Sequence, residues 1–195
     1  MANPDYATLL SLIAAESDPA AKAILEAQLL MLASHNILNP ANGAPVTVPS
    51  QDMVLGLYYM TKERKSTKEV PIKGEGLTFY SPEEVTIAFN EEKVNLNAGI
   101  KVRTKDFNEE GVLVTQIIQT TVGRVLFNEV VPEQAGYIND VLTKKSLRGV
   151  IGDILKVTDI PTVGHFLDEI KNMGYKFAFQ GGLSFSLGDI IIPDE

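Results

Sequence analysis

Two segments in which apolar and polar side chains alternate most constrain what this chain can fold into. They are residues 100–105 and 112–119, and Asn108-Glu109-Glu110-Gly111 lies between them. Alternation places every second side chain on one face of a strand, and a short polar turn between two such strands indicates a hairpin. The pattern therefore predicts a two-stranded antiparallel ribbon.

Most of the remaining chain has helical spacing of its apolar residues, in blocks separate from this ribbon. The spacing predicts helices over residues 6–16, 19–34, 51–60, 82–92 and 143–157, and a further helix that begins at Pro161 and falters near Gly174. Residues 121–131 fit a strand and a helix equally, and residues 183–192 are predicted to form a strand. Helices and hairpins are thus segregated, so the predicted fold class is α+β.

Several helix starts are indicated by residues that can accept a hydrogen bond from the first turn. Asp18, Ser50 and Thr143 are the predicted N-caps, and Ser81-Pro82-Glu83-Glu84 predicts a capping box. The helix over 51–60 is expected to bury Val54, Leu55, Leu57 and Tyr58. Leu30 and Met31 widen the apolar stripe of the helix over 19–34, so we expect that helix to be covered on more than one side.

Composition excludes several classes of protein. The 195 residues include no Cys, which excludes disulfides, thiolate zinc sites and cysteine nucleophiles and fits a reducing compartment. No apolar run approaches the length of a membrane span, and the N-terminus lacks the pattern of a secretion signal. We therefore expect a cytoplasmic protein without membrane contact.

The charge balance argues against a stand-alone DNA-binding protein. Lys and Arg number 17 against 25 Asp and Glu, so the net charge is −8, and no large basic cluster could neutralise phosphates. The densest basic stretch consists of Lys62, Arg64, Lys65 and Lys68. It has two interpretations, a solvated loop after a helix or a contact with a phosphate or a partner.

A search for catalytic and metal-binding patterns finds none that is self-sufficient. His165, Asp168 and Glu169 would share one helical face, which fits either a metal site or a polar pair on a solvated surface. Neither type of glycine-rich phosphate loop is present, and residues 182–186 miss the last position of the nucleophile-elbow pattern. We therefore predict no catalytic residue and no metal site in this chain.

One stretch, residues 36–52, differs from ordinary packing sequence. It contains three Pro, three Asn, Gln51 and Asp52 between two apolar helices. Asn42 and Gly43 are expected to supply the positive φ angles of a hairpin turn. Rigid, irregular backbone with many amide side chains indicates a positioned functional group, although a proline-stiffened connection explains the same composition.

A series of short motifs runs along residues 22–193. They are residues 24–28, Asn36-Ile37-Leu38, Pro40-Ala41-Asn42-Gly43, residues 48–61, Lys73-Gly74-Glu75-Gly76, Thr120-Thr121-Val122-Gly123-Arg124, Val131-Pro132, Lys144-Lys145, Gly182-Leu183-Ser184-Phe185 and residues 188–193. In sequence and in order, these segments resemble the beta-prime subunit family of bacterial RNA polymerase, in particular its Bacteroidetes members.

The resemblance implies a place in a larger enzyme. It corresponds to the pore region of the largest subunit, which forms the wall of the secondary channel where nucleotides enter and RNA 3′ ends leave. By position, Gln51 would face the active centre and the mobile trigger loop, with Asn42, Ser50 and Asp52 as supports. The implied partners are the rest of beta-prime and the other polymerase subunits, with DNA and RNA bound only in the assembled enzyme.

The departures from the family pattern imply that this chain alone is inactive. The family's Asn-Ala-Asp-Phe-Asp-Gly-Asp loop, which holds the catalytic magnesium, should precede Ile24, and the bridge helix and trigger loop are expected beyond residue 195. We therefore expect no cofactor in this chain itself. The expected domains are an N-terminal helical cap unlike the family (1–21), a pore-like α+β domain (22–142), and a helical segment with a terminal strand that leads into the funnel region (143–195).

A second interpretation of the function is open. The chain could be a stand-alone acidic α+β protein-interaction module, natural or engineered, that keeps a polymerase-derived fold without its activity.

Overall fold

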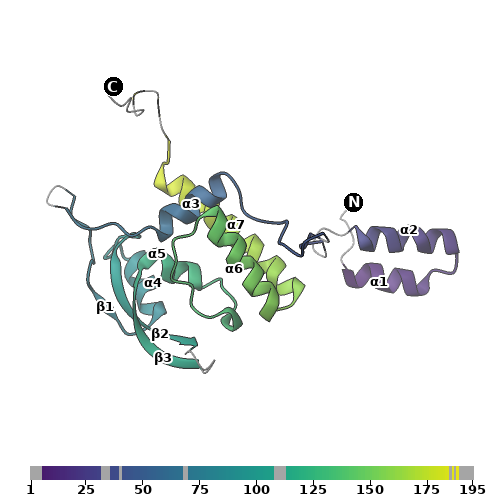
Figure 1. The fold of residues 1–195 in the computed structure, drawn as a ribbon, viewed down its shortest axis with the longest axis horizontal. Helices are drawn as coiled ribbons and strands as arrows, with labels where there is room; N and C mark the ends of the chain where they lie inside the picture. Colours follow the sequence, from purple (N-terminus) through teal and green to yellow (C-terminus); the bar gives the residue numbers. More distant parts are fainter. Residues whose placement is uncertain are drawn as a thin grey trace. The chain divides into compact units, whose positions relative to one another are not determined.

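The computed structural model describes residues 6–31, 36–39, 41–67, 70–107, 113–184, 186 and 188. The chain divides into two compact units, residues 1–47 and 48–195, and each is described by itself. The described residues form helices and a small three-stranded sheet, which confirms the predicted α+β class (Figure 1). The domain boundaries predicted after residues 21 and 142 stay predictions.

Unit 1 begins with two helices that pack against each other, α1 (Tyr6–Ala15) and α2 (Pro19–Leu30). Asp18 caps α2 as predicted, because its carboxylate accepts a hydrogen bond from the Ala20 backbone N–H at 3.2 Å. The expected cover on more than one side of α2 is not found. No α2 residue is buried, and the Leu30 and Met31 side chains are 75% and 80% exposed.

The predicted hairpin of unit 1 is present, and its two sides meet where the sequence predicts. Leu38 and Pro45 form an antiparallel bridge, and the Asn39 N–H donates to the Ala44 carbonyl at 2.9 Å. Gly43 has a φ of +65°, but Asn42 does not have a positive φ, so that part of the prediction is wrong. A four-residue loop needs only one left-handed residue, whereas a two-residue turn needs two.

Unit 2 contains a sheet of three strands, β1 (Thr78–Phe79), β2 (Gly99–Phe107) and β3 (Leu113–Thr121). β2 and β3 pair antiparallel, which confirms the predicted ribbon; its predicted turn at 108–111 lies outside the described residues. β1, which the sequence analysis did not predict, pairs parallel to β2. Helices α4 (Pro82–Asn90) and α5 (Val122–Asn128) pack on the sheet, which buries Ile100 and Val102 on that side.

The capping signals of α4 and α5 are only partly those predicted. Ser81 accepts a hydrogen bond from the Glu84 N–H, but the Glu84 carboxylate accepts from Tyr80 N–H at 2.6 Å instead of closing the box on Ser81. The Ser81 hydroxyl also lowers the pKa of the Glu83 carboxyl by hydrogen bonding. The ambiguous residues after Thr121 form a helix, which Thr121 caps by accepting from the Arg124 N–H.

The last two long helices are α6 (Lys144–Val157) and α7 (Ile160–Gly181), which follow a short 3-10 helix, η2 (Glu133–Ala135). Thr143 caps α6 as predicted, through reciprocal hydrogen bonds with Ser146. The prediction that α7 falters near Gly174 is wrong, because the helix continues to Gly181. Residues 183, 184, 186 and 188 are not in a strand, contrary to prediction, and the rest of that segment lies outside the described residues.

Candidate functional site

The candidate site lies at the start of α3 (Asp52–Thr61), the helix that follows the proline-rich stretch. Two predictions about this helix are wrong. Its N-cap is Gln51 and not Ser50, and no side chain caps it. Its buried residues are Gly56, Leu57, Met60 and Thr61, whereas Leu55 and Tyr58 are 42% and 36% exposed.

A glycine contact with α7 explains which face of α3 is buried. A Cβ atom added to Gly56 would lie 1.9 Å from the Gly174 carbonyl oxygen, and one added to Gly174 would lie 2.7 Å from the Met53 carbonyl oxygen. Both distances are too short for any side chain atom, so the two backbones meet directly. Gly174 lacks a side chain and so allows this close approach of the two helices. The contact stabilises α7 at this position, and the helix continues past Gly174 for that reason.

The C-terminal end of α3 is held by a hydrogen-bond network around Thr61, whose side chain is fully buried. The Thr61 hydroxyl donates to the Leu57 carbonyl at 2.8 Å and accepts from the Leu142 N–H at 3.0 Å. The Arg124 Nε donates to the Thr61 carbonyl at 3.0 Å, and Arg124 also bonds the Asn139 side chain. These bonds join α3 to α5 and to the segment before α6.

Asn97 and Gly123 complete this attachment. The Asn97 amide donates to the Tyr59 and Lys62 carbonyls at 2.7 and 2.8 Å, which satisfies acceptors at the end of the helix. A Cβ on Gly123 would lie 1.8 Å from the Met60 carbonyl oxygen, so α5 approaches α3 as closely as α7 does. Sequence reasoning did not identify Asn97, Gly123 or Arg124 as residues that attach α3. It did single out the motif Thr120-Thr121-Val122-Gly123-Arg124, which contains Gly123 and Arg124.

Gln51 has the most unusual backbone geometry of the four predicted site residues. Its φ of 52° and ψ of −125° lie in a region where residues other than Gly are strained, at a cost of about 1 to 3 kcal/mol. Ser50 and Asp52 flank it in unit 2, and Asp52 is exposed in the first turn of α3. Asn42 belongs to unit 1, where its side chain accepts from the Ala44 N–H. The functional roles of all four stay predictions.

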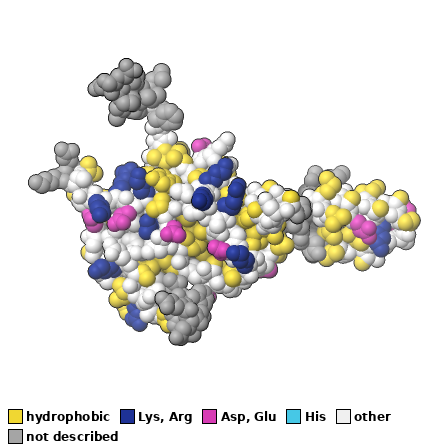
Figure 2. Space-filling view, viewed as in Figure 1, with side chains coloured by type: hydrophobic (Ala, Val, Ile, Leu, Met, Phe, Trp, Pro, Cys, Tyr) yellow, Lys and Arg dark blue, Asp and Glu magenta, His cyan; other side chains and the backbone are white. Residues whose placement is uncertain are grey.

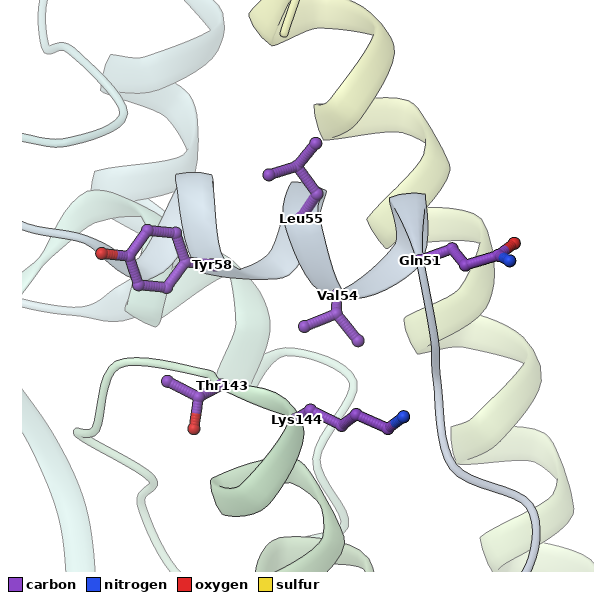
Figure 3. Close-up of a pocket in the computed structure, with 6 residues that line it drawn as sticks. All are labelled: Gln51, Val54, Leu55, Tyr58, Thr143 and Lys144. Carbon is purple, nitrogen blue, oxygen red and sulfur yellow. The ribbon is translucent and has the colours of Figure 1, made fainter. Parts of the chain in front are cut away.

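A shallow groove of about 350 Å³ lies between α3 and the start of α6 (Figure 3). It is lined by Gln51, Val54, Leu55, Tyr58, Thr143 and Lys144, and the Val54 side chain points toward Thr143 and Lys144. Lys144 and Lys145 occupy the first turn of α6, where the helix dipole disfavours cations by about 0.3 to 1 kcal/mol each. The groove therefore combines apolar walls with one end that favours an anionic group.

The described part of the basic stretch after α3 is exposed, which fits both a solvated loop and a contact with a phosphate or a partner. Lys62 lies 5.3 Å from the centre of the Tyr58 ring and Arg64 lies 5.7 Å from that of Tyr59, so both cations stack on α3. Lys68 lies outside the described residues. Figure 2 shows basic side chains spread over this face among acidic and apolar ones.

The described residues contain no group of three or more His, Asp or Glu side chains placed to bind a metal. Asp168, one of the residues near His165, forms an ion pair with Lys171 at 2.9 Å.

None of the helices in the described ranges has both the length and the apolar character of a membrane span. The cytoplasmic location stays a prediction.

Comparison with known proteins gives consistent matches. Residues 36–190 match the family described as RNA polymerase Rpb1, domain 3. Over 174 residues, 89% of this chain, the sequence is 75% identical to DNA-directed RNA polymerase subunit beta' of Flavobacterium johnsoniae, 76% to that of Flavobacterium psychrophilum and 62% to that of Bacteroides fragilis. The chain spans about 12% of the length of these curated relatives.

Proposed function

The chain belongs to the family of RNA polymerase Rpb1, domain 3, and on this premise we propose that it forms part of the secondary-channel wall in a bacterial DNA-directed RNA polymerase. The observation that supports the proposal is the 75% identity over 174 residues to a beta-prime subunit. In this role, nucleotides pass α3 on their way to the active centre, and backtracked RNA 3′ ends leave by the same route.

The construction of α3 suits a helix that must present one residue at a fixed position. The Gly56–Gly174 contact fixes its middle, and the Arg124–Thr61 bond fixes its end. Rigid elements hold functional groups more accurately than loops do. In the proposal, Gln51 faces the channel at the free end of this helix, and the lysines at the start of α6 attract the phosphates of entering nucleotides.

We propose that the chain contributes shape and electrostatics and that the catalytic magnesium is bound elsewhere in beta-prime. The sequence contains no Asn-Ala-Asp-Phe-Asp-Gly-Asp run, and three convergent carboxylates are what such a metal requires. The partners in the proposal are the remainder of beta-prime and the other polymerase subunits.

A segment exchange tests the proposal. Residues 36–190 replace the matching segment of the Flavobacterium johnsoniae beta-prime subunit, and the polymerase is reconstituted. We expect template-dependent RNA synthesis at the rate of the unmodified enzyme. The matched control is the same exchange with Gly56→Ala, which should impair assembly because the α3–α7 contact has no room for a Cβ.

One outcome of this exchange, and one outcome of a binding test on the separate chain, would count against the proposal. An enzyme that assembles with the exchanged segment but makes no RNA would show that the segment cannot serve as the channel wall. A separate chain that stays monomeric and has no affinity for polymerase lacking this segment would favour the alternative, a stand-alone acidic interaction module.

The role of Gln51 is tested separately in the exchanged enzyme. Gln51→Ala should change the rate of nucleotide addition or the duration of pauses, while Ile87→Ala, an exposed position on α4, should change neither. Unaltered kinetics in the Gln51 variant would remove this residue from the site but would leave the wall itself intact.

A further inference from the structure

One face of the β1-β2-β3 sheet is covered by α4 and α5, and the opposite, outer face is exposed. This outer face presents a row of basic side chains that the sequence analysis did not single out. Lys101, Arg103 and Lys105 occupy alternate positions of the central strand β2, so they lie on one face. All three are exposed, whereas Ile100 and Val102 on the opposite face are buried. The Cα atoms of successive members of the row are about 6.5 to 7 Å apart along the strand.

The neighbours of this row are uncharged. The register places Gln119, Ile117 and Thr115 of β3 directly opposite Lys101, Arg103 and Lys105. Acidic residues at these positions would stabilise the sheet through cross-strand pairs. The chain has 25 acidic residues, yet no carboxylate of the described ranges forms an ion pair with any of the three cations. Within these ranges the three cations have no acidic partner, so the row can attract an external anion.

An aromatic side chain borders the row on its other side. Tyr80, immediately after β1, is 74% exposed, and the Arg103 guanidinium lies 5.1 Å from the centre of its ring. Thr78 pairs with Lys101 across the sheet and is also exposed. The face thus combines cations, hydroxyl and amide groups, and a flat stacking surface.

We propose that this sheet face binds single-stranded RNA. Phosphates would lie along Lys101, Arg103 and Lys105, a base would stack on Tyr80 or Arg103, and Thr78, Thr115 and Gln119 would hydrogen-bond ribose hydroxyls or base edges. Single-stranded RNA is commonly bound on open sheet faces by aromatic and Arg side chains. An acidic peptide would use the cations but not the stacking surface, so the Tyr80–Arg103 pair favours RNA.

RNA binding by the sheet face is a separate property from the channel-wall function. It can therefore be measured on the full chain in isolation. The assay measures fluorescence anisotropy of a labelled oligouridylate at increasing salt. Each phosphate contact on a single strand contributes about −0.7 to the slope of log K against log salt, so three contacts give a slope of about −2. We expect Lys101→Gln, Arg103→Gln and Lys105→Gln combined to bring that slope close to zero and to remove most of the affinity at low salt.

A control with the same change in net charge separates local binding from general attraction. Lys93→Gln, Arg148→Gln and Lys176→Gln combined remove three exposed cations away from the sheet face and should leave both slope and affinity nearly unchanged. Tyr80→Ala should weaken binding without changing the slope, because stacking releases no counterions. Circular dichroism checks that each variant, altered only at exposed positions, keeps its helical signal.

Several results would overturn the proposal. Loss of binding in the control variant equal to that in the sheet variant would indicate attraction by overall charge. Competition by polyglutamate as strong as competition by RNA would assign the face to an acidic peptide. Equal affinity for the matching oligodeoxythymidylate would reject RNA as the specific ligand, and absence of binding by the unmodified chain at low salt would reject the site.

Discussion

The substitution Gly56→Ala tests how α3 is positioned. A Cβ at this position would lie 1.9 Å from the Gly174 carbonyl oxygen and 2.8 Å from the Ala178 nitrogen. Both atoms belong to the backbone of α7, so no flexible side chain can move aside. The added methyl group must therefore push the two helices apart.

The size of the effect follows from two opposing contributions. Ala is favoured over Gly inside a helix by about 1 kcal/mol. Over-packing costs about 1 to 3 kcal/mol and occasionally more, and a backbone clash this close belongs at the upper end. The net loss in free energy of unfolding is then about 2 kcal/mol, which lowers the melting temperature by about 4 to 8 °C for a unit of this size.

The matched control is Gly149→Ala in α6, where an added Cβ would meet no atom within 4 Å. Here only the helix preference acts, so we expect a gain of about 1 kcal/mol. Thermal and urea unfolding followed by circular dichroism measure both variants. The reasoning would be refuted if Gly56→Ala were as stable as Gly149→Ala.

Three further predictions concern the network around Thr61, the strained residue Gln51 and the Asp159–Thr162 contact at the start of α7. Arg124→Met should cost about 1 to 3 kcal/mol in urea unfolding, because the buried Thr61 carbonyl loses its donor; an unchanged midpoint would mean that this bond is not needed. Gln51→Gly should be more stable than Gln51→Ala by about 1 kcal/mol, because only Gly relieves the positive φ, and the reverse order would contradict the backbone geometry. The Thr162 hydroxyl lowers the pKa of the Asp159 carboxyl, so this contact stabilises the fold at neutral pH and is lost as pH falls through the lowered pKa; in an NMR titration Thr162→Val should raise that pKa, and an unshifted carboxyl would argue against the hydrogen bond.

The fold elements that depend on local sequence could be predicted. The β2–β3 ribbon and the helices α1, α4 and α6 follow from periodicity and capping residues, which act within a few residues. β1 could not be predicted, because a strand of two residues has no period and exists only by pairing with β2.

The errors at α3 and α7 have one physical cause. Gly56 and Gly174 have no side chain to mark a buried face, so apolar spacing assigned Leu55 and Tyr58 to the core instead. The same contact explains why Gly174 does not end α7. Close approach of two backbones is decided by tertiary structure, and a single sequence indicates only that a Gly is present.

The candidate site was predictable in part. The amide-rich stretch and the family resemblance pointed to Gln51, but its strained backbone and the groove beside Lys144 required coordinates. The anchoring role of Arg124 was not recognised, because its partners Thr61 and Asn139 are distant in sequence.

The secondary-channel assignment is tested most directly by crosslinking in the assembled polymerase. The exchanged beta-prime segment receives a photoreactive amino acid at Gln51 or, as a control, at the exposed Ile87, and transcription complexes are stalled in a backtracked state with a labelled RNA 3′ end. We expect label transfer from the RNA to position 51 and none to position 87. Equal labelling of both positions, or no labelling of position 51 in active complexes, would contradict a place for α3 beside the channel.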